Sequence, residues 1–529
     1  MTAKKRILIV GGVAGGASCA ARLRRMSETV EIVMFDRGPY VSFANCGLPY
    51  YVGDVIKKEE NLLVATPELF RNRFNIEVRL HSEVTAIDRG QRRIEVRDLT
   101  RGTTYRENYD ELVLSPGARS IRPDLPGIDL PGIFSLRTIP DSRMLRQWIQ
   151  SNQATRAVVV GGGYIGMEIT ENLVKRGLKV TVIEKQDQIM PVADPEMVTA
   201  VQDSLKHHGV RLHLNESVTG FEPDGSHILK VGLSSGQQLQ TDLVVLCIGV
   251  QPEIQLARQT GLEIGDGGGI RVDAQMTTSD PHIRAVGDAV EVRDVITGRD
   301  GVIPLAGPAN RQGRIAADAI LGRPAAFRGV QGTSVVGILD QVLAFTGPSE
   351  KLLRRLGLWE EMEKIYLHPG HHAGYYPGAS PITLKLIFAR SDGRVIGAQA
   401  VGKGGVEKRI DVIAMAIQKG ATVFDLEEAE LCYAPQFGSA KDPVNLAGMI
   451  AANVMRGDVS LEHWEAVAQS GALILDVRDP SEYKHGHVGG ALNLPLDQLR
   501  DRLDELPVDR EILAYCYVGA SALIMPRAP

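Results

Sequence analysis

The sequence predicts a multidomain α/β protein, and three observations support this fold class. The chain has 529 residues, which is more than one domain of the usual ~100–200 residues holds. Two short apolar segments each run into a glycine-rich turn and then a helical pattern, as in the strand–turn–helix units of parallel sheets. The content of 44% hydrophobic and 23% charged residues allows each domain an ordinary core. We therefore expect two nested Rossmann-like domains, then an α+β domain and a partial α/β domain.

Charge and cysteine content exclude several classes of protein. A formal net charge of −5 and an isoelectric point near 6.2 give no electrostatic basis for binding nucleic acid. No apolar run reaches the ~18 residues that a membrane-spanning helix needs. The five cysteines are odd in number and widely spaced, and no Cys-x-x-Cys pair offers a metal site. We expect a cytoplasmic protein without a metal, a nucleic-acid partner or a membrane partner.

The first glycine-rich turn, at residues 11–16, follows an apolar strand at residues 7–10. Glycines let the backbone approach a pyrophosphate, and the helix start beyond the turn offers N–H donors. Val13 departs from the G-x-G-x-x-G pattern, because it stands at the middle glycine position. Strands at residues 112–114 and 283–286 end at the sheet edge where ligands bind in such folds. The predicted contacts with this first dinucleotide are Gly11, Val13, Gly16, Asp36, Ser115, Gly287 and Asp288.

The second turn, at residues 161–166, matches the full pattern and follows an apolar strand at residues 157–160. Its predicted contacts are Gly161, Gly163, Gly166 and Glu184. The acidic Glu184 favours the free 2′-hydroxyl of NADH, while the neighbouring Lys185 leaves NADPH open. Two dinucleotide sites in one chain indicate hydride transfer from NADH to FAD, with Asp288 holding the flavin's ribityl chain.

A single cysteine, Cys46, follows the first nucleotide-binding unit in the segment SFANCGLPY, residues 42–50. Dithiol reductases need a second cysteine close by, and the next one in this chain is Cys247. Cys46 would therefore act alone, as a thiolate that forms a mixed disulfide, a persulfide or a sulfenic acid. The flanking Ser, Asn and Gly favour such a role over that of a small buried hydrophobe.

These features, with the segments YYPG at 375–378 and YAP at 433–435, resemble coenzyme A-disulfide reductase. This is a single-cysteine branch of the pyridine nucleotide-disulfide oxidoreductases, and the resemblance covers about residues 4–455. It implies FAD, NADH and coenzyme A as cofactors and substrate. It also implies a homodimer with shared active sites and a C-terminal interface domain.

The resemblance further implies roles for particular residues. Cys46 would hold coenzyme A as a mixed disulfide, and Tyr375 and Tyr433 of the partner subunit would protonate the departing thiolate. Tyr376 is the alternative to Tyr375 as the proton donor. Phe74 stands where some relatives have a basic contact, which is a departure. Coenzyme A contacts, cationic where they meet its phosphates, are implied at Ser18, Arg22, Arg25, Ser42, Asn45, Asn310 and Lys441.

NADH peroxidase and NADH oxidase resemble the chain over the same span and also use one cysteine. In the peroxidase a histidine precedes the paired glycines of the first turn, and this chain has Ala14 there. That difference and the two tyrosine segments favour reduction of CoA disulfide, CoA persulfide or polysulfide. The alternative is an oxidase or peroxidase in which Cys46 forms a sulfenic acid, with the C-terminal tail as a sulfur-binding or docking module.

The tail after residue 458 has a different character. A buried strand ending in DVR, a helix from Pro480 and the run GHVGGALNLP at 486–495 resemble the rhodanese (sulfurtransferase) domain. A strand at residues 512–515 would deliver Cys516 to the place of the persulfide-carrying cysteine. That family has an arginine five residues later, where this chain has Ser521, and two prolines in the last residues do not continue a helix. We expect an incomplete domain with impaired sulfur transfer.

The expected domains and the remaining candidate groups follow from these motifs. Cys19 and Cys247 are expected in the core, the latter inside a strand at 243–248, and His371-His372 lacks the companions of a metal site. Cys432, beside Tyr433, has no expected role. The domains are FAD-binding at 1–118 and 270–328, NAD(P)H-binding at 119–269, dimerisation at 329–456 and rhodanese-like at 457–529.

Overall fold

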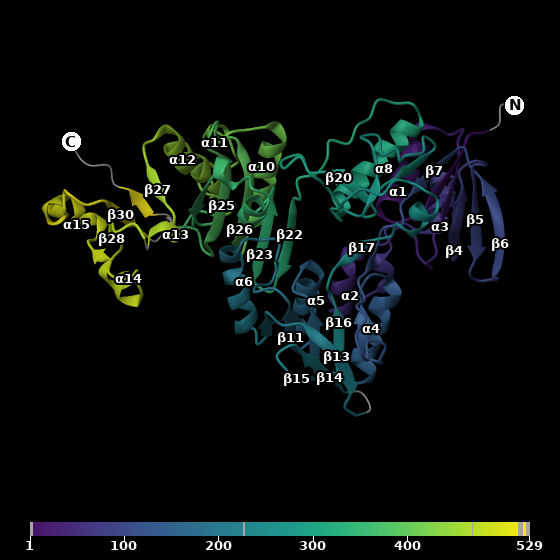
Figure 1. Cartoon of the computed structure of the whole chain (residues 1–529), viewed down its shortest axis with the longest axis horizontal. Coiled ribbons are helices and arrows are strands. Elements are labelled where there is room, and N and C mark those ends of the chain that lie inside the picture. The colour runs from purple at the N-terminus through teal and green to yellow at the C-terminus, as the bar shows by residue number, and fades with distance from the viewer. Residues whose placement is uncertain (1–3, 226–227, 468, 517–521, 525–529) are drawn as a thin grey trace. The chain divides into compact units, whose positions relative to one another are not determined.

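The chain forms two compact units in a computed structural model that describes residues 4–225, 228–467, 469–516 and 522–524. The first unit comprises Met1–Pro191 and Leu205–Gly332, and the second comprises Val192–Ser204 and Thr333–Pro529 (Figure 1). No helix in the described residues is long and apolar enough to cross a membrane.

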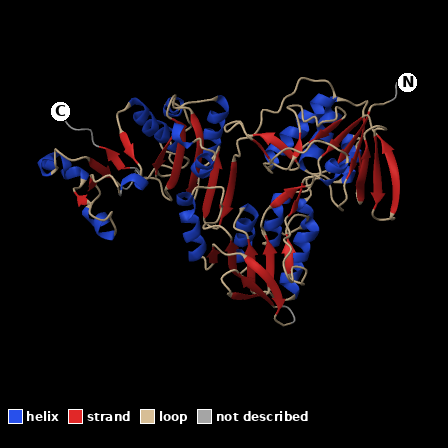
Figure 2. Cartoon of the chain, viewed as in Figure 1, coloured by secondary structure: helices blue, strands red, loops and turns tan. Residues whose placement is uncertain are grey.

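A five-stranded parallel sheet in the first unit carries the first glycine turn. Its order is β19-β7-β1-β2-β3, with β1 at the centre. Helices α1 and α8 lie side by side against it (Figures 1 and 2). They pack closely because Gly313 of α8 has no side chain, and a Cβ there would lie 2.2 Å from the carbonyl oxygen of Gly15. The elements are β1 Arg6–Val10, α1 Ala14–Met26, β2 Glu31–Phe35, β3 Glu77–Arg79, β7 Glu111–Leu114, β19 Ile283–Ala285 and α8 Ala306–Ile320.

A second five-stranded parallel sheet in the same unit carries the second turn. Its order is β12-β11-β10-β16-β9, so β10 is central as β1 is in the first sheet. Helix α4 begins at a reciprocal capping box between Thr138 and Asp141. The elements are β9 Ile133–Ser135, α4 Ile139–Ser151, β10 Arg156–Val160, α5 Tyr164–Lys175, β11 Lys179–Glu184, β12 Arg211–Leu214 and β16 Leu243–Leu246.

Smaller elements complete the first unit. Two three-stranded antiparallel sheets are β4 Ser82–Asp88 with β5 Arg93–Asp98 and β6 Thr103–Asn108, and β13 Val218–Pro223 with β14 Leu229–Leu233 and β15 Gln238–Thr241. Further pairings join β8 Ala118–Ser120 to β17 Val250–Pro252, and β18 Ile270–Arg271 to β20 Val290–Arg293 and β21 Asp300–Gly301. The short helices are η1 Asn45–Gly47, α2 Leu48–Val52, η2 Glu59–Leu62, α3 Pro67–Phe74 and α7 Gln255–Gln259.

The second unit is built on a five-stranded antiparallel sheet in the order β22-β23-β26-β25-β24. Its strands are β22 Ser334–Ile338, β23 Gln341–Thr346, β24 Met362–Leu367, β25 Ile382–Ala389 and β26 Val395–Gly402. Its helices are α9 Glu350–Arg355, η3 Trp359–Glu361, α10 Val406–Lys419, α11 Val423–Glu427 and α12 Pro443–Arg456. Helix α6, Pro195–His207, begins in this unit although its sequence lies between two strands of the second parallel sheet.

The C-terminal part of the second unit has its own mixed sheet, in the order β27-β31-β30-β28-β29. The predicted strand at 512–515 and the predicted helix from Pro480 are confirmed as β30 and α14. The position of Ser521 lies outside the described residues. The elements are β27 Ser460–Glu462, α13 Trp464–Val467, β28 Leu473–Asp476, α14 Pro480–His485, β29 Leu492–Asn493, α15 Leu496–Leu499, η4 Arg500–Glu505, β30 Ile512–Tyr515 and β31 Ala522–Ile524.

The predicted place of Cys247 inside a strand is wrong. Strand β16 ends at Leu246, and Cys247 is only partly buried, although burial of its thiol raises its pKa to about 12. The chain turns here beside the second glycine turn, where a Cβ on Gly161 would lie 2.3 Å from the carbonyl oxygen of Cys247. Cys19, by contrast, lies in the core as expected.

Candidate functional site

The first glycine turn connects the central strand β1 to helix α1. Gly11 has φ +93°, and a Cβ there would lie 2.0 Å from the carbonyl oxygen of Ser115. A Cβ on Gly16 would lie 1.9 Å from the carbonyl oxygen of Gly11, so the start of α1 is packed on the turn itself. Val13 occupies the N-cap position of α1 without a side-chain cap, and its carbonyl accepts the Ala17 N–H. The turn therefore presents backbone to its surroundings, as a pyrophosphate site requires.

Asp36 is held at the carboxyl end of β2. Its two carboxylate oxygens accept the N–H groups of Gly12, at 3.1 Å, and Gly38, at 2.9 Å. Burial raises the pKa of Asp36, and these hydrogen bonds oppose that rise. Ser115, after β7, accepts the Gly16 N–H at 3.0 Å. Both side chains therefore brace the turn, and Asp36 is fixed where a ribose would lie.

Cys46 lies in η1, directly before helix α2, and is exposed. The preceding segment is anchored, because the Ser42 N–H donates to the carbonyl of Gly12 at 2.8 Å. Burial of the thiol, followed by the negative charges of Glu168 and Asp288, raises the pKa of Cys46, and the Arg137 guanidinium opposes this. Asp288, the predicted ribityl-binding residue, follows β19, and its charge acts on the Cys46 thiol.

Two residues of this environment were missed from the sequence. Arg137 pairs with Asp288 at 3.0 Å and donates to the carbonyl of Ala118, and its own carbonyl accepts the Asn45 amide. Burial, followed by the charge of Glu171, raises the pKa of Glu168 to about 7. Glu168 lies on α5, two residues after the last glycine of the second turn. This position close to a glycine motif could have identified it from the sequence. Arg137 carries no comparable signal, because it is one arginine in a segment without a motif.

The second glycine turn repeats the geometry of the first. Gly161 has φ +106°, and a Cβ on Gly166 would lie 1.9 Å from the carbonyl oxygen of Gly161. A Cβ on Gly163 would meet nothing within 4 Å, so the protein itself does not require glycine there. Gly163 is the counterpart of Val13 in the first turn, where this position carries a side chain. Glu184 is buried at the end of β11, and its carboxylate accepts the N–H groups of Gly162, at 2.7 Å, and Gln186, at 2.8 Å.

Both turns fit a dinucleotide. Each offers backbone without a crowding side chain, a helix start, and a carboxylate fixed at the end of the neighbouring strand. At the first site, Gly287 and Asp288 follow β19, and the Gly287 N–H donates to Gln312 at 2.7 Å. These donors and carboxylates suit FAD at the first turn and NAD(P)H at the second.

The two predicted tyrosines lie together in the second unit. The hydroxyls of Tyr375 and Tyr433 are 2.5 Å apart, and both side chains are exposed. The hydrogen bond with Tyr375 raises the pKa of Tyr433, and partial burial adds to it. Tyr376 instead packs edge-on against the ring of His372. The pairing therefore selects Tyr375 over its neighbour as the partner of Tyr433.

The residues expected to contact coenzyme A fall into three groups. Ser18, Arg22 and Arg25 lie on one face of α1, where Ser18 donates to Asn310 and the Arg25 guanidinium lies 5.6 Å from the centre of the Phe74 ring. Arg22 makes two hydrogen bonds to Asp318, at 3.0 and 3.1 Å, so its charge is already paired. A second group, Ser42 and Asn45, belongs to the Cys46 segment, and Lys441 is exposed in the second unit.

Cys516 follows β30 at the end of a buried polar network. Asp476, at the end of β28, accepts the Tyr515 hydroxyl at 2.5 Å and the Arg478 guanidinium at 2.7 Å. Burial raises the pKa of Asp476, but the bonds from Arg478 and Tyr515 outweigh this and lower it overall. The Tyr515 hydroxyl also accepts the Val488 N–H, so the residue before Cys516 is tied to two segments.

Comparison with family models assigns most of the chain. Residues 5–313 match "Pyridine nucleotide-disulphide oxidoreductase", residues 334–442 match its dimerisation domain, and residues 461–527 match the rhodanese-like domain. Coenzyme A disulfide reductase of Staphylococcus haemolyticus is 34% identical over 445 residues, which cover 84% of this chain and 98% of that protein.

Solved structures agree with this assignment. Reduced CoADR-RHD of Bacillus anthracis has a TM-score of 0.94 and 47% identity, over 97% of this chain and 92% of that one. A NAD-dependent persulfide reductase from A. fulgidus has a TM-score of 0.90 and 34% identity, over 97% and 94%. A water-forming NADH oxidase from Lactobacillus brevis reaches 0.81 with 26% identity, over 86% and 100%.

The glycine turns with their carboxylates, the domain matches and the relatives agree with one another. The protein is an oxidoreductase, and its family uses FAD and NAD(P)H. The chain belongs to the pyridine nucleotide-disulphide oxidoreductase family and carries a rhodanese-like domain after its dimerisation domain.

Proposed function

We propose that this protein is a homodimeric flavoenzyme that uses NADH to reduce a CoA disulfide, a CoA persulfide or a polysulfide through Cys46. The observation that carries the proposal is the place of Cys46: exposed, in the electrostatic environment of Asp288 and Arg137, and without a second cysteine nearby in the sequence. Similarity to a coenzyme A disulfide reductase and a persulfide reductase supports the substrate class.

The chemistry assigns a distinct task to each side chain. Bound FAD supplies two-electron transfer between NADH and sulfur. The Cys46 thiolate attacks one sulfur of CoA disulfide, which breaks that S–S bond, forms a Cys46–CoA mixed disulfide and releases a CoA thiolate. A tyrosine hydroxyl protonates this thiolate. Two electrons and one proton then cleave the mixed disulfide, which restores the Cys46 thiolate and frees the second CoA thiol.

Tyr375 and Tyr433 of the partner subunit are the proposed proton donors. Tyr433 is protonated at neutral pH, as a proton donor must be, because the ordinary pKa of tyrosine is about 10. The hydrogen bond with Tyr375 raises the pKa of Tyr433 further. The close contact between the two hydroxyls allows the proton that one tyrosine gives up to be replaced from the other. The proposed coenzyme A contacts are the α1 face with Asn310, the Cys46 segment and Lys441.

The first experiment is anaerobic NADH oxidation by the flavin-loaded protein with CoA disulfide, CoA persulfide and polysulfide in turn. We expect turnover with at least one of these, its loss in Cys46→Ser, and its retention in Cys432→Ser, which removes the other exposed thiol of the reductase part. Turnover that survives in Cys46→Ser would remove the single-cysteine mechanism.

An NADH oxidase is the second candidate, because the Lactobacillus brevis oxidase shares the fold over most of the chain. In that case Cys46 would cycle through a sulfenic acid. Oxygen uptake stoichiometric with NADH, in the absence of any sulfur substrate, would support the oxidase, whereas NADH consumed only with sulfur substrates would exclude it.

The tail is proposed to be a rhodanese-like domain that receives or delivers sulfane sulfur at Cys516. Removal of residues 458–529 distinguishes direct transfer from docking. Lost polysulfide turnover with intact CoA disulfide turnover supports transfer, and unchanged turnover of both supports a docking role.

A further inference from the structure

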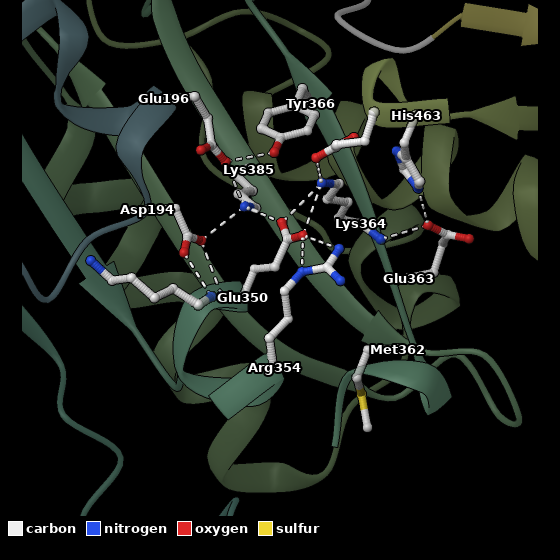
Figure 3. Close-up of polar contacts among 12 residues, drawn as sticks. Asp194, Glu196, Glu350, Arg354, Met362, Glu363, Lys364, Tyr366, Lys385 and His463 are labelled. Carbon is white, nitrogen blue, oxygen red and sulfur yellow. Dashed lines mark hydrogen bonds and ion pairs between the residues drawn. The ribbon is translucent and has the colours of Figure 1, made fainter. Parts of the chain in front are cut away.

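The five-stranded antiparallel sheet β22-β23-β26-β25-β24 is here called the dimerisation sheet, because it lies in the part of the chain that matches the dimerisation domain. A cavity of about 640 Å³ in the second unit lies between this sheet and the first residues of the rhodanese-like domain. Its walls come from the start of α6, from α9, from strands β24 and β25, and from residues 463–465 (Figure 3). Lys364, Tyr366 and Lys385 share one face of the sheet, because Tyr366 pairs with Lys385 across the strands and Lys364 is two residues from Tyr366. The cavity is therefore built on charged side chains of one sheet face.

A buried ammonium occupies the centre of these charges. Lys385 is fully buried and contacts Asp194 at 2.8 Å, Glu196 at 2.6 Å and Glu350 at 2.7 Å. The three carboxylates would suit a metal ion by their spacing, but the Lys385 ammonium already lies among them and pairs with all three. We interpret this group as a structural ion cluster, and its contacts continue towards the rhodanese-like domain.

Lys364 extends the cluster to the rhodanese-like domain. Its side chain is buried and contacts Glu350 at 2.9 Å on one side and Glu465 at 3.3 Å on the other. Its neighbour Glu363 contacts His463 at 2.7 Å and Arg390 at 3.1 Å. Two consecutive residues of β24 therefore pair with two residues of a five-residue segment.

The opposite side of that segment touches the strand that precedes Cys516. The Trp464 ring meets the Tyr515 ring edge-on, with 5.7 Å between the ring centres. Val467 shares a small hydrophobic core with Leu513 of β30. Helix α13 is thus held by the Glu465–Lys364 ion pair to β24 and by apolar and aromatic contacts to β30.

We propose that residues 463–467 form a clasp that positions β30, and with it Cys516, against the dimerisation sheet through Lys364. The clasp fixes the position of Cys516 within the second unit. Without it, Cys516 would belong to a flexibly tethered domain. It rests on the proposed function only in treating Cys516 as the sulfur carrier. Lys364, Glu465 and Trp464 are positioning residues, because none of them needs to touch the sulfur.

The test removes the ion pair from each side in the flavin-loaded full chain. Glu465→Gln removes the charge of the exposed partner and preserves the buried cluster. Lys364→Met removes the charge of the buried partner. The readouts are hydrogen exchange of peptides over residues 460–467 and 512–516, and the rate of iodoacetamide alkylation of Cys516 by mass spectrometry. In Glu465→Gln we expect both rates to rise about three- to fivefold, the change that loss of one partly exposed ion pair produces. In Lys364→Met we expect a larger rise, because that variant also removes the buried contact with Glu350.

The controls separate the clasp from a general loss of stability. Lys351→Met removes a cation that lines the same cavity and makes no ion pair within the described residues, and we expect no change. Lys364→Arg should restore the wild-type rates, because a guanidinium also reaches two carboxylates. Raising the salt concentration should speed alkylation more in the wild type than in Glu465→Gln, since the variant lacks the exposed Lys364–Glu465 pair that salt screens.

Unchanged exchange and alkylation in both Glu465→Gln and Lys364→Met would overturn the proposal. Equal effects from Lys351→Met would also overturn it, because the response would then report the cavity and not the clasp. These readouts do not depend on NADH turnover. A protein inactive towards every sulfur substrate would therefore refute the proposed function and leave the clasp standing.

Discussion

Replacing Lys385 by methionine leaves three carboxylates around an uncharged side chain of similar length. Removing one partner of a buried ion pair costs about 3–5 kcal/mol. Here the lower end applies, because Glu350 keeps Lys364 and Arg354, and Asp194 keeps the N–H groups of Glu350 and Lys351. We therefore expect a loss of about 3 kcal/mol in the local stability of the dimerisation sheet.

The loss should depend on pH in a defined direction. Burial alone would raise the pKa of Glu350, but Lys385, Lys364 and Arg354 lower it to about 2. A carboxyl with a lowered pKa stabilises the fold above its ordinary pKa of about 4.3, and this contribution is lost as the pH falls towards 2. In Lys385→Met the carboxylates lose their central cation and bind protons more readily. The loss of local stability relative to the wild type should therefore shrink as the pH falls from 8 to 5.

Hydrogen exchange of amides in β24, β25 and α9 measures this loss, because a chain of several domains does not unfold in one step. A deficit of 3 kcal/mol corresponds to exchange about 100-fold faster at pH 8. The matched control is Lys403→Met, whose ion pair with Asp340 at 2.9 Å is exposed and should contribute at most about 1 kcal/mol. A deficit below that of Lys403→Met, or one equal at pH 5 and pH 8, would refute the reasoning.

Three further outcomes are expected. Glu168→Gln lowers the pKa of Cys46, because one of the charges that raise it is gone. The pH dependence of Cys46 alkylation in flavin-free, reduced protein measures this change, and an unchanged pKa would show that the two groups do not interact. Tyr375→Phe or Tyr433→Phe should slow CoA disulfide turnover about 100-fold, because the thiolate then lacks its proton donor. The rate of Cys46 alkylation should stay unchanged. Full turnover in the double variant would exclude both tyrosines as proton donors. Glu184→Ala raises the ratio of kcat/KM for NADPH over NADH about tenfold, equal to about 1.4 kcal/mol; a constant ratio would mean that the carboxylate does not face the ribose.

The local features of the fold were predictable from the sequence. The glycine turns, the strands before them and the acidic residues after the following strands are short-range patterns, and the structure places β1, α1, β10 and α5 accordingly. The end of β16 was predicted wrongly, because apolar residues continue to Ile248 while the backbone must already turn beside Gly161. An apolar run does not record such a close approach between distant segments.

The charged parts of the site could not be predicted for the same reason. Lys385 interrupts an apolar strand and reads as a solvent-facing position, but it is fully buried because three carboxylates from other segments meet it. Asp194 and Glu196 come from the start of α6, which the sequence places among the nucleotide-binding elements. Arg137 likewise matters only through its ion pair with Asp288 and its effect on the pKa of Cys46, and both residues lie far from it in the chain.

The carboxylates of Asp36 and Glu184 each accept a hydrogen bond from the glycine turn beside them. Because Glu184 is also proposed to contact the ribose, coenzyme choice and the shape of the turn would be linked at the second site. An engineer who removes Glu184 to admit a 2′-phosphate also leaves the Gly162 N–H without its acceptor, and the turn loses a brace at the same time. A redesign for NADPH would need a new acceptor for that N–H, supplied from a residue other than the one proposed to contact the ribose.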